Sequence, residues 1–461
     1  MNNTGIKPKV IEEIRTFARK YNIDKVILFG SRARGDYKRT SDIDLAVVGG
    51  DFARFVLDVD EETSTLLEYD IVDMSREMQD ELRQSIMQEG KILYEKDANT
   101  PDGIASITKL LTIYLVYKDI KEGKLSWNTK VDISDYAYDL TTDSLASNVP
   151  MEKRQYTVKE LVNASLVASA NSAAIALTEK VGGSESKFVD MMSAQLKEWG
   201  ITDASLVNSS GLNNSMLGDN IYPGSSSDAE NMMSAKDVAI VARHLILDFP
   251  EVLDITSQST SDFDGVTMTS SNLMLKYMTS YRDGVDGLKT GTTDLAGACF
   301  VGTTEENGMR IITVILNADN GDTDSTARFT ATNNLMNYIY TTYTVQTVLE
   351  KGQSYKNNTV EVLDGKKPDV SAVAKDTFKV ITPRTTASTA LTFDLKKETP
   401  TAPVTKGQTV ATLTYKDKSL VGSGYLDGEP SVQMVAKNDV KRSFFLKVWW
   451  NHFVRYVNEK L

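Results

Sequence analysis

The sequence predicts a multidomain protein in which an α/β domain, an α+β domain, a β-rich domain and a C-terminal amphipathic helix follow one another. Three observations support this fold class. The 461 residues are enough for about three domains. Residues of chemically reactive types form two groups, one before residue 75 and one between residues 106 and 292. After residue 345, β-type segments alternate with Gly, Pro and Lys turns. We therefore expect domains at 1–92, 93–345, 346–438 and 439–461.

Composition narrows the classes of function. The chain is 41% hydrophobic and 25% charged, with a formal net charge of −12. This negative charge argues against sequence-independent binding of nucleic acid, so we expect no nucleic-acid partner. The single cysteine, Cys299, excludes an internal disulfide and lies in an apolar strand-like segment, which is typical of a core residue.

The first group of residues lies on three predicted strands. The segment Lys25–Ser31 reads as a strand that runs into a tight turn, and a second strand begins with Asp42 and Asp44. Alternation places both aspartates on one face of that strand. A third strand, Tyr69–Val72, can bring Asp70 to the same place. Because neighbouring carboxylates repel each other unless a cation lies between them, this pattern favours a divalent metal site.

The turn of the first strand supplies the other half of this predicted site. Gly30 and Ser31 would hold a phosphate group through backbone N–H groups and a hydroxyl. A Gly-Ser pair followed about ten residues later by Asp-x-Asp resembles the minimal nucleotidyltransferases of the DNA polymerase β superfamily, over roughly residues 8–96. The resemblance implies Mg²⁺ and a nucleoside triphosphate (NTP) as cofactors, metal-assisted nucleotidyl transfer and a separate helical partner chain. For the Asp-x-Asp alone, the alternative is a solvated strand end.

The second group begins with Ser106 and Lys109. A serine hydroxyl becomes a good nucleophile only when a base takes its proton. The two histidines, His244 and His452, lie beside no plausible Ser/Asp pair, so Lys109 is the candidate base. A buried helix that opens at Ser106 would put the two side chains one turn apart. Burial and nearby cations would lower the lysine pKa. Taken alone, Ser106 would be interpreted as a helix N-cap, and Lys109 as a solvated lysine on the surface.

A second pair, Ser169 and Asn171, interrupts an apolar helical stretch that opens with a capping box of Thr157 and Glu160. This interruption suggests a junction between two helices that line a cleft. Ser169 could then relay a proton to a leaving amine, and Asn171 could bind a substrate amide. The alternative is a simple helix break.

The third segment is Lys289-Thr290-Gly291-Thr292, just before an apolar strand and a later strand from Arg310. A lysine and hydroxyls on a strand edge can bind a terminal carboxylate. Gly291 leaves space where a substrate backbone would approach. The backbone N–H groups of Ser106 and Thr292 would donate to the oxyanion that forms when the serine attacks a carbonyl group. The alternative is a turn before a strand.

In this order, the S-x-x-K, S-x-N and K-T-G motifs resemble the low-molecular-mass penicillin-binding proteins, the serine D-alanyl-D-alanine carboxypeptidases, over roughly residues 90–461. The resemblance implies a β-lactamase/transpeptidase-like α+β domain that needs no cofactor. It implies removal of the terminal D-alanine from a peptidoglycan stem pentapeptide ending in D-Ala-D-Ala, through an acyl-enzyme on Ser106, and acylation by β-lactam antibiotics. We find no E-x-x-L-N-like stretch, which argues against a β-lactamase. The alternatives are a nucleotidyltransferase and a non-catalytic penicillin-binding protein.

The C-terminal part should be non-catalytic. Four strands are expected in the β-rich domain, at Thr359–Leu363, Thr377–Ile381, Ala390–Leu395 and Thr409–Tyr415. In the tail, one helical face carries six large apolar residues: Phe445, Leu446, Trp449, Trp450, Phe453 and Val457. Aromatic residues with basic neighbours favour a helix in the plane of a membrane surface. Charge interrupts the tail too often for it to span a bilayer. The alternative is a helix packed on the protein itself.

The N-terminal residues do not match the resemblance to the serine carboxypeptidases, which are exported by a signal peptide. Carboxypeptidases of this class act at the extracytoplasmic face of the cell membrane, but Met1–Lys7 and the residues after Lys7 contain no apolar segment of a signal peptide, which leaves a cytoplasmic location open. The segment Gly90–Lys96 fits both families. We interpret the chain as a fusion at this shared segment and expect the serine-enzyme sheet to lack one strand, with an edge exposed.

Overall fold

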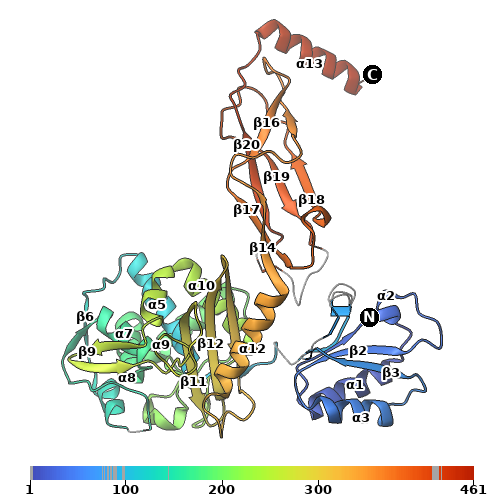
Figure 1. The fold of residues 1–461 in the computed structure, drawn as a ribbon. Coiled ribbons are helices and arrows are strands. Elements are labelled where there is room, and N and C mark those ends of the chain that lie inside the picture. Colours follow the sequence, from blue (N-terminus) through green and yellow to red (C-terminus); the bar gives the residue numbers. More distant parts are fainter. Residues whose placement is uncertain are drawn as a thin grey trace. The chain divides into compact units, whose positions relative to one another are not determined.

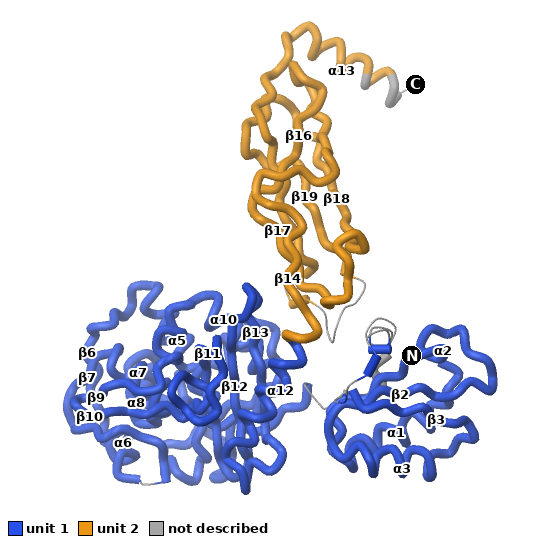
Figure 2. Tube along the Cα trace, viewed as in Figure 1, with its two compact units in different colours: residues 1–339 blue, residues 340–461 orange. Residues whose placement is uncertain are grey.

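A computed structural model describes residues 4–74, 76, 78–79, 82–83, 86, 91–95, 99–143, 145–417, 425–426 and 428–460. Side chains of residues 91–95, 455 and 458–460 lie outside this description. Contacts divide the chain into two compact units, residues 1–339 and 340–461 (Figure 2). The first unit contains the N-terminal α/β fold and the α+β fold, and the second contains the β-rich fold and the terminal helix (Figure 1).

The N-terminal fold is a four-stranded sheet in the order β3-β2-β1-β4. Its strands are β1 (Lys25–Leu28), β2 (Ile43–Val48), β3 (Tyr69–Asp73) and β4 (Lys91–Glu95). Strand β1 is antiparallel to β2 and β4, and β2 is parallel to β3. Helices α1 (Pro8–Lys20) and α3 (Phe52–Glu62) pack apolar faces against the sheet, with the fully buried Ile14 and Phe55 in one core.

Two details of this domain differ from the expectation. The three predicted strands are confirmed, but the turn after β1 is a short helix, α2 (Gly30–Arg34), which Gly30 begins with a φ of +66°. The junction segment is strand β4, which pairs with β1 and therefore belongs to the N-terminal sheet.

The α+β fold is built around helix α5 (Lys109–Lys121), which is buried along most of its length. Helices α7 (Val158–Val167), α8 (Asn171–Gly182), α9 (Glu185–Glu198) and α10 (Ala235–Asp248) share its apolar core. A helix buried on nearly every side reads as apolar all around, as α5 does. The smaller helices are α6 (Asp135–Asp139), η2 (Leu140–Thr142), η3 (Asn214–Met216), η4 (Gly218–Asn220), η5 (Pro250–Val252) and α11 (Leu253–Thr256).

The main sheet of this fold has the order β11-β12-β13 in the described part of the chain. Its strands are antiparallel: β11 (Val285–Thr293), β12 (Gly297–Glu306) and β13 (Met309–Ile315). The Lys-Thr-Gly motif lies within β11, at an edge of this sheet as predicted. Cys299 is fully buried in β12, in agreement with a core role. Helix α12 (Ala327–Thr342) follows the sheet. Three two-stranded pairs complete the fold: β5 (Asp102–Gly103) with β8 (Met232–Met233), β6 (Lys130–Asp132) with β7 (Gln155–Thr157), and β9 (Thr260–Phe263) with β10 (Val266–Thr269).

The second unit is β-rich, as expected. A five-stranded sheet has the order β15-β16-β20-β19-β18, and β14 pairs with β17. The bounds are β14 (Tyr343–Leu349), β15 (Thr359–Glu361), β16 (Asp369–Ala374), β17 (Phe378–Pro383), β18 (Phe393–Lys397), β19 (Thr409–Tyr415) and β20 (Ser431–Ala436), with a short helix η6 (Ser388–Ala390). The four predicted strands correspond to β15, β17, β18 and β19, whereas β14, β16 and β20 were not predicted.

The tail forms helix α13 (Phe445–Lys460). Large apolar side chains on it are exposed, among them Trp449 at 64% and Trp450 at 58%. The helix contacts its own unit through the buried Val448 and through His452, whose Nε2 lies 2.8 Å from Asp364 Oδ2. In the part of the chain that the structure describes, no helix combines the length and apolarity needed to cross a bilayer. Membrane-surface binding by α13 stays a prediction.

Candidate active site

Ser106 and Lys109 lie at the start of the central helix. Ser106 is in a 3-10 turn, η1 (Ala105–Thr108), and α5 begins only at Lys109, so the α-helix does not open at the serine as we expected. The turn nevertheless brings the side chains together, with Lys109 Nζ 2.9 Å from Ser106 Oγ. Ala105, just before the serine, has a φ of +43°. Such backbone strain in a residue other than glycine is concentrated at functional sites.

Lys109 is fully buried and has three polar neighbours. Besides Ser106, its Nζ contacts Asn171 Oδ1 at 2.6 Å and the Ser210 carbonyl oxygen at 2.7 Å. Burial, and to a lesser degree the charge of Lys289, hold the pKa of Lys109 well below its usual value. A neutral amine has two N–H donors and one lone pair. The two acceptors can take both protons, which leaves the lone pair for the proton of Ser106.

Ser169 and Asn171 lie where two helices meet, as the sequence predicted. Ser169 follows α7, has a φ of +59° and is buried, and Asn171 is the first residue of α8. The Asn171 side chain bridges two parts of the site, because its Nδ2 donates to the Ser147 carbonyl at 2.9 Å while its Oδ1 accepts from Lys109. Its first observed role is therefore to orient the lysine. The relay role of Ser169 stays a prediction.

Strand β11 brings the third motif against the serine turn. Gly291 packs on η1 so closely that a Cβ there would lie 2.8 Å from the Ile104 carbonyl oxygen. The glycine thus makes room for the protein's own backbone, a contact that sequence reasoning had assigned to the substrate. Lys289 is 2% exposed, and burial followed by repulsion from Arg328 lowers its pKa to about 7. The hydroxyl oxygens of Thr290 and Ser271 are 2.6 Å apart.

Two contributors to the site escaped sequence reasoning. Arg328, on α12, is 7% exposed, and its Nη1 donates to the Gly291 carbonyl at 2.8 Å and to Thr292 Oγ1 at 2.9 Å. It adds a second buried cation beside Lys289. Ser210 contributes only a backbone carbonyl, which no residue type can signal. The sequence offers only one indication of Arg328, which is that an arginine lies near the start of the helix that follows the sheet.

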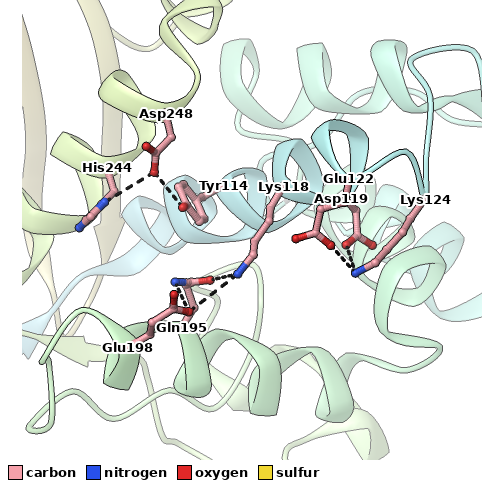
Figure 3. Close-up of polar contacts among 9 residues, drawn as sticks. All are labelled: Tyr114, Lys118, Asp119, Glu122, Lys124, Gln195, Glu198, His244 and Asp248. Carbon is pink, nitrogen blue, oxygen red and sulfur yellow. Dashed lines mark hydrogen bonds and ion pairs between the residues drawn. The ribbon is translucent and has the colours of Figure 1, made fainter. Parts of the chain in front are cut away.

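The two histidines do not provide the base. His244 stacks on Trp199 with ring centroids 4.3 Å apart, and its Nδ1 lies 3.6 Å from Asp248. Figure 3 shows His244 and the Tyr114 hydroxyl both directed at Asp248, and none of the residues labelled there is a serine. His452 pairs with Asp364 in the second unit. Lysine as the base is consistent with both contacts.

The N-terminal sheet brings its predicted residues to one end. In the parallel register of β2 and β3, Asp44 lies directly opposite Asp70, and Asp42 directly precedes β2. Burial, and then the charges of Asp70 and Asp42, raise the pKa of Asp44. Gly30 lies against the same carboxylate, because a Cβ at Gly30 would come 2.3 Å from Asp44 Oδ2. Ser31 is the next residue of α2.

Arg32 supports this end of the sheet from within the domain. It is 1% exposed, and its guanidinium donates to the carbonyl oxygens of Ser41 and Asp42 and, at 3.1 Å, to that of Thr4. Carboxylate oxygens are ligands that Mg²⁺ prefers. However, no group of three Asp, Glu, His or Cys side chains within the described ranges is arranged closely enough to hold a metal ion. The magnesium and NTP assignments therefore stay predictions.

Three segments of the chain match known protein families. Residues 86–320 match the family described as D-alanyl-D-alanine carboxypeptidase. Residues 12–99 match the polymerase beta nucleotidyltransferase family, and residues 343–442 match the C-terminal domain of penicillin-binding protein 5. The first two matches share residues 86–99, so the junction segment fits both families, as its sequence suggested.

Individual relatives agree with these assignments. A crystal structure of a peptidoglycan synthesis regulatory factor (PBP3) from Streptococcus pneumoniae is 54% identical, with a TM-score of 0.72, and the match covers 76% of this chain and 96% of that one. The D-alanyl-D-alanine carboxypeptidase DacF of Bacillus subtilis is 26% identical over 77% of this chain and 84% of its own length. A putative protein adenylyltransferase of Methanocaldococcus jannaschii is 37% identical over 19% of this chain and 96% of its own length.

The N-terminal fold is thus a nucleotidyltransferase domain of the polymerase β type. The remainder has the penicillin-binding protein fold with its C-terminal β-rich domain. Because the first family match spans more than half of the 461 residues and is supported by a 54% identical relative, the chain belongs to the D-alanyl-D-alanine carboxypeptidase family.

Proposed function

We propose that this protein is a serine D-alanyl-D-alanine carboxypeptidase that removes the terminal D-alanine of peptidoglycan stem pentapeptides. The observation that carries the proposal is the buried Lys109 amine, 2.9 Å from Ser106 Oγ, with its two other neighbours both hydrogen-bond acceptors. This arrangement suits a neutral lysine that acts as a general base for serine. The relatives that carry the carboxypeptidase name support the substrate class.

In the acylation step, Ser106 Oγ attacks the carbonyl carbon of the penultimate D-alanine while its proton moves to Lys109. The backbone N–H groups of Ser106 and Thr292 would stabilise the oxyanion. The C–N bond then breaks, and the proton that Lys109 accepted passes by way of Ser169 to the leaving nitrogen of the terminal D-alanine, so that Lys109 is neutral again. Water next attacks the ester carbonyl and gives a proton to Lys109. The C–O bond to Ser106 then breaks, Lys109 returns the proton to Ser106 Oγ, and the shortened peptide leaves with a new carboxyl group.

The terminal carboxylate of the substrate would lie near β11. Lys289 and Arg328 supply positive charge there, and Thr290 supplies a hydroxyl donor. Two buried cations that have no carboxylate partner among the described residues favour an incoming anion, because charge-assisted hydrogen bonds are the strong ones. A β-lactam carries both a reactive carbonyl and a carboxylate, so the same groups would hold it while Ser106 opens its ring.

Release of D-alanine from a diacyl-D-Ala-D-Ala peptide tests the proposal. We expect release by the parent protein and none by Ser106→Ala. A folded parent that binds a β-lactam covalently but releases no D-alanine would instead fit a non-catalytic penicillin-binding protein.

A second candidate activity is nucleotidyl transfer by the N-terminal domain, favoured by the alignment of Asp44 with Asp70 beside Gly30. Mg²⁺ would have to draw Asp42, Asp44 and Asp70 closer together, because these described residues are not arranged as a metal-holding group as folded. Gly30 and Ser31 would contact the phosphates of an NTP. The metal would supply charge neutralisation for the phosphates. Transfer of labelled nucleoside monophosphate to protein, present with Mg²⁺ and lost in Asp42→Ala, tests this activity. The absence of transfer, with and without a helical partner chain, would count against it.

For α13 we propose binding to a membrane surface, supported by the exposure of Trp449, Trp450 and Phe453. If the chain acts at the extracytoplasmic face, as the family does, this helix would hold the carboxypeptidase at the membrane surface close to its peptidoglycan substrate. Deletion of residues 441–461 should abolish co-sedimentation with liposomes, and unchanged co-sedimentation would contradict the assignment.

A further inference from the structure

A serine outside the three motifs contacts the third motif directly. Ser271 lies in the connection between β10 and β11, and its Oγ is 2.6 Å from the Oγ1 of Thr290. Thr290 is 7% exposed, whereas Ser271 is exposed. The pair therefore lies at the boundary between the buried site and solvent, where a substrate would enter.

The backbone on both sides of Ser271 is fixed. The Ser270 N–H donates to the Ser259 carbonyl at 2.8 Å, and the Asn272 side chain accepts from the N–H of Met274 at 3.0 Å. Met274 is fully buried in a core shared with β11 and β12. Ser271 thus projects from an ordered segment, and its hydroxyl position does not depend on a freely moving loop.

Counting protons shows what the contact provides. Two hydroxyl groups have two protons, and the hydrogen bond between them uses one. The other proton remains for a third group. Because Ser271 restrains the rotation of the Thr290 hydroxyl, it can fix the direction in which the pair presents that remaining donor.

The charge around Thr290 indicates what the third group is. Lys289 is the preceding residue on β11, and Arg328 donates to the two residues that come after Thr290. Because side chains alternate along a strand, Thr292, which Arg328 contacts, lies on the same face of β11 as Thr290. A donor on the face that this buried guanidinium reaches suits a carboxylate better than a neutral amide. The carboxylate available in the proposed reaction is the one on the terminal D-alanine.

We propose that Ser271 is a positioning residue that acts through Thr290 and makes the enzyme selective for substrates with a free terminal carboxylate. The inference rests on the proposed carboxypeptidase function. It concerns recognition of the substrate terminus and not the acylation chemistry, so Ser271 should influence KM more than kcat.

The test compares two substrates that differ only at the terminus, a diacyl-D-Ala-D-Ala peptide as the free acid and as the C-terminal amide. For Ser271→Ala we expect KM for the acid to rise about tenfold, the scale of one hydrogen bond to a charged group, with kcat within about twofold. KM for the amide should not change. Ser271→Thr retains a hydroxyl and should restore selectivity, and Ser280→Ala, in the same connection, is the matched control.

A double-mutant comparison separates positioning from a general structural effect. In a Thr290→Val background, Ser271→Ala should have no further effect on KM, because its route of action is gone. An unchanged KM for the acid, an equal loss on both substrates or full additivity with Thr290→Val would each overturn the inference. If the parent hydrolyses neither substrate, the proposed function itself fails, a result that differs from any of these.

Discussion

The two predicted sites of this chain shift the pKa values of their charged side chains in opposite directions, downward for lysines at the serine site and upward for Asp44 at the N-terminal site. At the serine site, burial lowers the pKa of Lys109 and Lys289, and the protein's own carbonyl and amide oxygens surround the Lys109 amine. At the N-terminal site, burial and neighbouring carboxylates raise the pKa of Asp44. The Lys109 amine therefore has its hydrogen-bond partners within the protein, whereas the carboxylates around Asp44 repel one another.

The largest effect is expected when the proposed base, Lys109, is removed. Lys109→Ala should slow acylation by a fluorescent penicillin by about 10³-fold, within the range that general-base catalysis contributes. The acylation rate under single-turnover conditions measures this loss. Lys118→Ala, on an outer turn of the same helix, is the control and should be acylated at the parent rate. A slow-down of less than tenfold in a folded Lys109→Ala variant would show that another group acts as the base.

A second test asks whether the end of the N-terminal sheet that carries Asp42 and Asp44 depends on the buried Arg32. Arg32→Ala removes a guanidinium that donates to three backbone carbonyls. We expect the N-terminal domain to lose about 2–4 kcal/mol of unfolding free energy, because buried acceptors are left without donors. Denaturant unfolding followed by a probe in that domain measures it. Penicillin acylation should stay unchanged, and a parallel loss of acylation would show that the two sites are not independent.

The smallest expected effect is a pH dependence of about tenfold. Lys109 acts as a base only when neutral, so acylation should rise with pH through its lowered pKa. Lys289 attracts a carboxylate only when charged, and it loses its proton as pH rises through its pKa of about 7. For a free-acid substrate, kcat/KM should therefore fall on the alkaline side, while the C-terminal amide should lack that falling limb. Identical profiles for the two substrates would remove Lys289 from carboxylate recognition.

Much of the fold could be predicted from local patterns. Short apolar segments located β1, β2, β3 and β13, and alternation placed the two aspartates on one face of the second predicted strand. The polar interruption at Ser169 located the junction of α7 and α8. Strands β14, β16 and β20 were missed. Their burial depends on packing within the second unit, which a short segment does not encode. The same reason applies to β4. Its sequence fits two families, and only its pairing with β1 in the folded protein shows that it belongs to the N-terminal sheet.

The site was predictable where side chains carry the chemistry. Spacing alone placed Lys109 beside Ser106, because residues three apart meet on a helical turn even when that turn is 3-10. Arg328 and Ser271 reach β11 from segments 36 residues and 19 residues away from the motif residues that they contact, so no local pattern joins them. The Ser210 carbonyl is a backbone group and leaves no mark on the residue type.

We expect Lys109 to make Ser106 a nucleophile in the folded full-length protein. Labelling of the purified full-length chain with a fluorescent penicillin, beside Ser106→Ala, tests it directly. We predict one covalent label on the parent and none on the variant. A folded parent that takes up no label, or equal labelling of Ser106→Ala, would contradict the claim.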